Sequence, residues 1–172
     1  MLFGAMLAGS TTTATVNTDA GNPVLLRLLG LSSRQALLQR LWIPGTLAFG
    51  WSLTALVLMQ LAGDLPAGPW FLFSVPAGVA GAVAAVRRAR SGFVRNDLLP
   101  LDTPMGTVST GPLVYALAGP DALILGVPMV IAISQGTPLT ATTLLFQTAL
   151  ALIGARAYLV GTTDPARLDL QP

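Results

Sequence analysis

The chain has 172 residues, of which 53% are hydrophobic and only 9% are charged, and its mean hydropathy is +0.71. Soluble domains carry roughly 25% charged residues, so this composition is typical of a membrane protein and excludes an ordinary water-soluble core. The pI is about 9.9, but the net charge is only +2 and aromatic residues do not interleave with the cations. The charges therefore give no reason to expect nucleic acid as a partner.

Several residue types are missing altogether. The chain has no Cys, His, Lys or Glu, so every cation is Arg and every anion is Asp. Without Cys or His there is no thiolate nucleophile, catalytic dyad or usual zinc site, and without Lys there is neither a Schiff base nor a P-loop. We therefore expect no enzyme, assign no catalytic residue, metal or cofactor, and expect any ATP-hydrolysing engine to be another polypeptide.

The N-terminal segment 1–24 joins an apolar stub to a polar stretch rich in Ser and Thr. Residues 1–9, "MLFGAMLAG", lack the charged start of a signal peptide. Nine residues at about 1.5 Å each cannot cross roughly 30 Å of hydrocarbon. We interpret them as the end of a helix, and such a start is expected of the C-terminal part of a longer protein.

Residues 25–41 predict two short amphipathic helices separated by a break at Gly30. Each places its leucines on one face: Leu25, Leu28 and Leu29 in the first, with Arg27 opposite, and Leu37, Leu38 and Leu41 in the second. Ser33 is the expected N-cap of the second helix, with Arg34 beside it reaching water. Both helices are expected to lie along a membrane surface.

Residues 42–161 predict a transmembrane domain of four spans. The first is an uncharged run of 21 residues, Trp42–Ala62, and the second is the uncharged segment 69–86 after a Gly- and Pro-rich turn. The connection 87–112 is polar and is not expected to be helical. The last span is 139–161, after the turn "QGTP", and a polar tail, 162–172, follows it.

The third span has two possible starts. Gly119, Pro120 and Asp121 interrupt the apolar segment 113–134. The favoured interpretation is a short surface helix over 113–118 and a span that begins at Asp121, because Pro and Asp are both favoured in the first helical turn. It leaves only 14 residues before Gln135, fewer than the roughly 20 expected. The alternative is one bent helix through the interruption.

The arginines predict the topology. They precede the first span, follow the second and follow the fourth, and the two short turns contain none. By the positive-inside bias, both termini and the 87–112 connection are cytoplasmic. The expected fold is therefore an all-α, multi-pass protein of the cell membrane with about four spans, both termini in the cytoplasm, and an amphipathic cytoplasmic segment before the first span.

Polar residues inside the spans are candidates for function. The candidates are Gln60, Asp121, Gln147 and Arg156. Arg156 is expected to snorkel to the membrane surface, and the glutamines to form hydrogen bonds between helices rather than a polar pathway. Asp121 is expected at the surface, although the bent-helix alternative would make it an ion or proton site.

Small residues mark one face of the second span. Gly78 and Ala82, and Gly81 and Ala85, form two pairs separated by three residues. Such pairs let another helix approach closely, without identifying that helix.

The stretch "LLRLLGLSSRQALLQRLWIPGTL" resembles the cytoplasmic segment of ABC-2-type exporter permeases, in which a stretch rich in Leu and Arg leads into a spanning helix. Gly30, Ser33, Arg34, Leu37, Leu38 and Arg40 carry the resemblance. "LDTPMGTVSTGP" and "AGPDALILG" look like the C-terminal part of long, uncharacterised multi-pass proteins of actinobacteria. Permeases of this family usually have six spans, so the resemblance implies that these four correspond to spans three to six.

The resemblance implies a permease-like subunit of an ABC-type export system, driven by a separate nucleotide-binding ATPase and assembled as a homo- or hetero-oligomer. The expected docking segment contains Arg27, Ser33, Arg34, Leu37, Leu38 and Arg40. The alternative is a non-transporting membrane scaffold or accessory subunit. The small-residue face of the second span is the observation that favours it. The sequence does not select a substrate.

Overall fold

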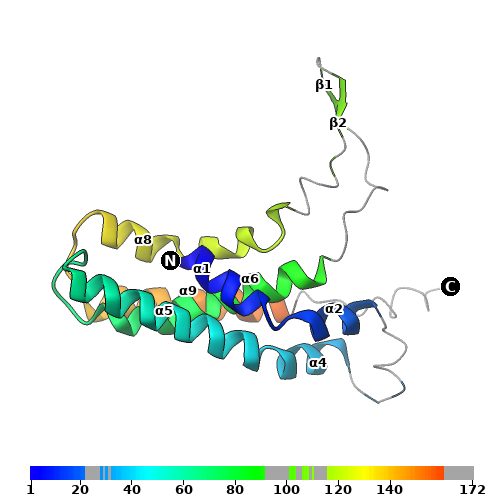
Figure 1. The fold of residues 1–172 in the computed structure, drawn as a ribbon, viewed down its shortest axis with the longest axis horizontal. Coiled ribbons are helices and arrows are strands. Elements are labelled where there is room, and N and C mark those ends of the chain that lie inside the picture. Colours follow the sequence, from blue (N-terminus) through cyan, green and yellow to red (C-terminus); the bar gives the residue numbers. More distant parts are fainter. Residues whose placement is uncertain are drawn as a thin grey trace.

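The computed structural model describes residues 1–21, 28, 30, 32–91, 101–103, 106–108, 110 and 116–160. Its core is a helical bundle, and four of its segments run alternately in opposite directions (Figure 1). They are α5 (Trp42–Ala62); η1 with α6 (Trp70–Phe73, Ser74–Arg90); η2 with α8 (Pro120–Gly126, Val127–Ser134); and α9 (Ala141–Val160). The α5–α6 and α8–α9 turns therefore lie at one end of the bundle, which we call the turn end.

Helix α4 (Ser33–Arg40) leads directly into α5. Its N-cap is Ser32 rather than the expected Ser33: the Ser32 hydroxyl accepts a hydrogen bond from the Gln35 N–H, and Gln35 bonds back to the Ser32 N–H. This reciprocal capping box satisfies two N–H groups, whereas a cap at Ser33 would forgo the partner at Gln35. Main-chain hydrogen bonds continue through Leu41, and the short break there reflects Pro44, which has no N–H to donate to the Arg40 carbonyl.

Helix α6 is the centre of the bundle, in contact with α1 (Leu2–Ser10), α2 (Ala14–Gly21), α5, η2 and α9. Of the most apolar 18-residue stretch within Trp70–Arg90, 72% is buried inside the bundle. The corresponding share within Arg34–Ala62, which contains α5, is 22%. Helix α6 also runs on to Arg90, so the expectation that the polar connection begins at residue 87 is wrong by one helical turn. Arginine is a good helix former, and cations in the last turn are stabilised by the helix dipole.

The small residues of α6 allow α1 and α5 to approach closely. A Cβ atom added at Gly78 would lie 2.8 Å from the Cα of Phe49 in α5, and one added at Gly81 would lie 2.8 Å from the Cβ of Ala5 in α1. The remaining members of the predicted face lie beside glycines of the same two helices: Ala82 faces Gly45, and Ala85 faces Gly9. The four small residues are therefore used for packing within the chain.

The two turns are joined at the turn end. The Leu139 N–H donates to the Ala67 carbonyl at 3.4 Å, and Trp70, in the adjacent η1, donates from Nε1 to the Pro66 carbonyl at 2.7 Å. Trp70 is fully buried and stacks on Phe73, with ring centroids 5.5 Å apart. This buried aromatic pair belongs to the largest described apolar cluster, with Leu2, Leu56, Leu65, Ala77, Met129 and Ala132.

The third segment begins directly after a turn at Gly119. Gly119 has φ = 102°, a conformation that favours glycine, and η2 starts at the next residue. Seven 3₁₀ residues at about 2.0 Å and eight α-helical residues at about 1.5 Å give the segment a length of about 26 Å. A continuous α-helix of the same residues would be about 22 Å long, so the 3₁₀ stretch partly offsets the shortness of the segment.

Outside the bundle, two short strands lie in the 87–112 connection. Strand β1 (Leu101–Thr103) pairs antiparallel with β2 (Gly106–Val108), with Asp102 opposite Thr107. Among the described residues these are the only strands, and the bundle itself is helical.

Candidate functional site

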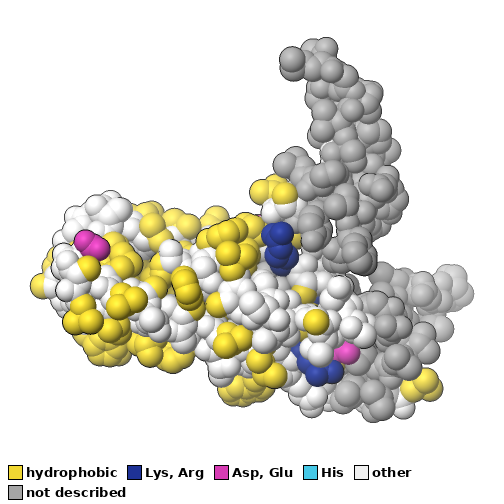
Figure 2. All heavy atoms as spheres, viewed as in Figure 1, with side chains coloured by type: hydrophobic (Ala, Val, Ile, Leu, Met, Phe, Trp, Pro, Cys, Tyr) yellow, Lys and Arg dark blue, Asp and Glu magenta, His cyan; other side chains and the backbone are white. Residues whose placement is uncertain are grey.

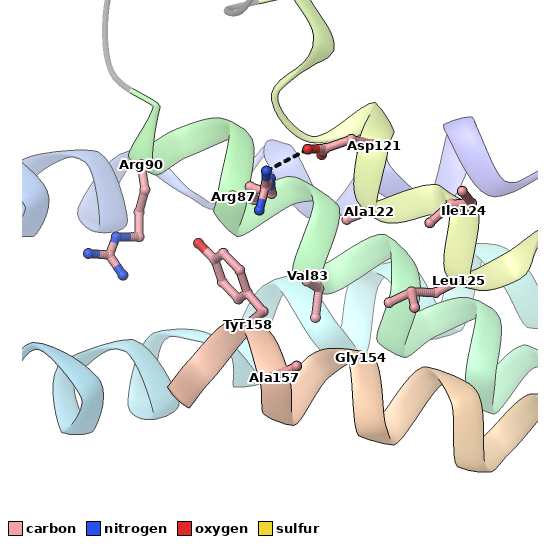
Figure 3. Close-up of a pocket in the computed structure, with 10 residues that line it drawn as sticks. All are labelled: Val83, Arg87, Arg90, Asp121, Ala122, Ile124, Leu125, Gly154, Ala157 and Tyr158. Carbon is pink, nitrogen blue, oxygen red and sulfur yellow. Dashed lines mark ion pairs between the residues drawn. The ribbon is translucent and has the colours of Figure 1, made fainter. Parts of the chain in front are cut away.

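Charged and polar side chains of three bundle segments meet at the end opposite the turns, which we call the arginine end. Arg87 and Arg90 come from the last turn of α6, Asp121 from the start of η2, and Tyr158 from the end of α9. These side chains line an open groove of about 570 Å³ (Figure 3). Residues 87 and 90 share a helix face because they are three positions apart.

An ion pair spans the groove. Arg87 Nη2 lies 2.6 Å from Asp121 Oδ2, and Asp121 Oδ1 accepts a hydrogen bond from the Gly119 N–H at 3.1 Å. The Arg87 guanidinium carbon lies 5.9 Å from the centre of the Tyr158 ring, within the range of a cation–π interaction. The Tyr158 hydroxyl points toward the space between the two arginines (Figure 3). Asp121 is thus exposed at the arginine end, and its place relative to a membrane surface stays a prediction.

The wall of the groove below these groups is apolar. It is formed by Val83, Ala122, Ile124, Leu125, Gly154 and Ala157. The described residues contain no group of three acidic, His or Cys side chains that could hold a metal ion. The groove can therefore hold an anion at its rim and an apolar chain along its wall.

The predicted docking segment lies at the same end of the bundle. Arg34 and Leu38 are exposed, whereas Leu37 is buried against Val16 of α2 and Val86 of α6. Arg40 pairs through Nε with Asp19 Oδ2 at 3.0 Å, which joins α4 to α2. Arg27 lies outside the described residues, as do Leu25 and Leu29 of the first expected helix. In the second of the two predicted leucine stripes, Leu37 therefore packs into the bundle while Leu38 is exposed.

The polar residues predicted within the spans do not meet at one place. Gln147 of α9 is 1% exposed and donates from Nε2 to the Leu125 carbonyl of η2, while its Oε1 has no hydrogen-bond partner. In a 3₁₀ helix the Leu125 carbonyl would accept a hydrogen bond from the N–H of residue 128. Residue 128 is proline, which has no N–H to donate. Gln60 belongs to α5 near the turn end, and its Oε1 is also buried without a partner. Arg156 is exposed near the end of α9.

The surface of the bundle is unusually apolar. Trp42 is 76% exposed, and large hydrophobic side chains are exposed on every long helix, among them Leu58, Leu61, Ile124, Leu145, Phe146 and Ile153. On the face shown in Figure 2, cationic side chains lie away from the turn end and hydrophobic side chains spread over much of the rest. Among the described residues, two helices are long and apolar enough to cross a membrane, Arg34–Ala62 and Trp70–Arg90.

Comparison of the chain with protein-family models, curated proteins and solved structures finds no match. The functional argument therefore depends on the residues themselves. Sequence reasoning used Arg87 and Arg90 only as topology markers and did not connect them with Tyr158. Their spacing on one helix face was the available signal, but the distance to α9 is a property of the fold.

Proposed function

We propose that the chain is a multi-pass membrane subunit whose four antiparallel segments cross the bilayer, with the arginine end in the cytoplasm. The main support is the combination of a largely apolar helix surface with described charged side chains that, apart from Asp64, gather toward the arginine end. In water, so much exposed apolar surface would favour aggregation, whereas in a bilayer it contacts lipid. The short third segment, about 26 Å, and α9, with 20 residues and about 30 Å, match the hydrocarbon thickness approximately.

The cysteine-free sequence allows a clean test of this topology. Asp64 and Gln135 are exposed in the two turns, and Gln39 is exposed at the arginine end. In intact cells, a membrane-impermeant maleimide should label Asp64→Cys and Gln135→Cys but should label Gln39→Cys only after the cells are opened. Equal labelling of all three positions in intact cells would contradict the topology.

Within that topology, the proposed role is a permease-like subunit of an ABC-type exporter that docks a separate cytoplasmic nucleotide-binding ATPase. Two observations support this role. The chain lacks the Lys of a P-loop, so it cannot itself supply a conventional ATPase site. Main-chain hydrogen bonds connect α4 through Leu41 to α5, so a force applied at Arg34 would be transmitted to a spanning helix.

Co-purification in mild detergent tests the docking. A nucleotide-binding subunit should be recovered in amounts comparable with the chain, and Arg34→Glu should remove it. Arg34 is the sharper site for this change, because Arg40→Glu would also break the ion pair with Asp19. Arg156→Glu is the control, since it introduces the same charge change on α9. An equal recovery of the ATPase with Arg34→Glu and wild type would rule out docking through α4.

The alternative, a scaffold or accessory subunit, predicts a stable complex that contains no ATPase. The small-residue face of α6 does not favour this alternative, because that face packs against α1 and α5 of the same chain. The same co-purification distinguishes the two roles by the identity of the partner recovered.

A further inference from the structure

The groove at the arginine end combines a charged and polar rim with an apolar wall. Its rim carries Arg87, Arg90 and the Tyr158 hydroxyl, and its wall is built from apolar side chains of α6, η2 and α9 (Figure 3). Asp121 offsets the charge of Arg87 through their 2.6 Å contact, so the rim keeps a net positive charge from Arg90. An anion is therefore the ligand that the rim favours.

The wall selects among anions. Val83, Ile124, Leu125 and Ala157 line it, and Gly154 lets the Leu125 side chain pack directly against α9, because a Cβ atom at residue 154 would overlap that side chain. A free inorganic phosphate would leave this wall unused, whereas a phospholipid would place its phosphate at the rim and an acyl chain along the wall. The volume of about 570 Å³ lies within the usual range of ligand pockets.

The position along the helices agrees with a lipid headgroup. Arg87 and Arg90 stand in the last turn of α6, Tyr158 lies two residues from the end of α9, and Asp121 opens η2. Tyrosines and arginines at helix ends occupy the headgroup level of a bilayer. Basic pockets between spanning helices on the cytoplasmic side are a known mode of anionic lipid recognition.

We propose that this groove binds an anionic phospholipid, with the phosphodiester at the rim beside Arg90 and Tyr158 and an acyl chain along the wall from Val83 to Leu125. The proposal rests on the membrane placement proposed above but not on the ABC-exporter role. Arg87 positions the ring of Tyr158 through their cation–π contact.

The test is native mass spectrometry of the full chain, purified in detergent and exposed to equimolar phosphatidylglycerol and phosphatidylcholine with the same acyl chains. Phosphatidylglycerol adducts should exceed phosphatidylcholine adducts by at least about fivefold, the factor equivalent to about 1 kcal/mol for one arginine near an anionic lipid. Arg90→Gln should abolish most of this excess. Ala157→Phe, which fills the wall without changing charge, should do the same.

Arg156→Gln is the matched control, because it removes an exposed cation from the same end of α9 without touching the groove. It should keep the phosphatidylglycerol excess, and circular dichroism should show the wild-type helix content for all three variants. Equal adducts of the two lipids, equal losses with Arg156→Gln and Arg90→Gln, or displacement of phosphatidylglycerol by millimolar inorganic phosphate would each overturn the proposal.

Alkaline extraction of membranes separates failure of this proposal from failure of the proposed function. A chain that stays in the membrane pellet but shows no lipid preference contradicts the lipid site alone. A chain released into the supernatant contradicts both.

Discussion

Arg87 of α6 and Asp121 of η2 form an ion pair with a 2.6 Å contact between Nη2 and Oδ2, and so hold the start of the third bundle segment against the end of the second. The contact joins two residues that are 34 positions apart in the sequence. Both side chains are partly exposed, 45% for Arg87 and 41% for Asp121, so water screens the attraction. The ion pair therefore fixes the position of η2 relative to α6 but contributes little to the free energy of unfolding.

A double-mutant cycle should measure a small coupling between Arg87 and Asp121. We expect Arg87→Gln, Asp121→Asn and the double variant to give a coupling of no more than about 1 kcal/mol in the free energy of unfolding, as for other exposed pairs. Unfolding by sodium dodecyl sulfate in mixed micelles supplies the measurement. A coupling above about 2 kcal/mol would mean that the pair is buried from water in the folded protein.

A methyl group at Gly81 should destabilise the bundle. The added Cβ would lie 2.8 Å from the Cβ of Ala5 and 3.2 Å from that of Ala48, and both neighbours are fixed to helix backbones. We expect Gly81→Ala to lower the free energy of unfolding by about 1–3 kcal/mol. Gly50→Ala is the matched control, because an added Cβ there meets nothing within 4 Å and alanine favours the helix by up to about 1 kcal/mol. Similar effects at the two positions would contradict the close packing of α1 on α6.

Two glutamines should respond in opposite ways to replacement by leucine. Gln147→Leu removes the hydrogen bond to the Leu125 carbonyl together with an Oε1 atom that has no partner, and we expect a net loss of up to about 1 kcal/mol in the free energy of unfolding, typical of hydrogen bonds between membrane helices. Gln60→Leu removes a buried oxygen that has no partner and should leave stability unchanged or raise it. The same detergent unfolding measures both. A larger loss for Gln60→Leu than for Gln147→Leu would contradict this assignment.

The tryptophans should report the depth of α5 in the bilayer. Trp42 and Trp51 are nine positions apart on this helix, or about 13.5 Å along its axis. In single-tryptophan variants with phenylalanine at the other two positions, lipids brominated near the headgroup should quench Trp42 most, and lipids brominated deeper in the chain should quench Trp51 most. If no brominated lipid quenches either residue, α5 lies outside the bilayer.

The helices and turns of the bundle could be predicted because their signals are local. Twenty-one uncharged residues from Trp42 to Ala62 predict a long apolar helix, and the Gly- and Pro-containing stretches 63–68 and 135–138 predict the turns. The structure confirms a helical bundle with two helices long enough to span a membrane, one of them α5 with its α4 extension. The number of spans and the side on which each end lies stay predictions.

Errors arose where two local signals compete within a few residues. Ser32 and Ser33 are both suitable caps, and the choice depends on Gln35, which can return a hydrogen bond only to Ser32. Likewise, the arginines after Val86 were interpreted as the start of a polar connection, although a helix tolerates them in its last turn.

Residue types and their neighbours along the chain suffice to predict an apolar, helical chain with turns that the arginines avoid. The packed bundle is needed to see that the small residues of α6 contact α1 and α5, that Gln147 reaches Leu125, and that Arg87, Asp121 and Tyr158 share one groove. These contacts join segments far apart in the chain, and their geometry depends on how closely the helices pack and how each is rotated about its axis.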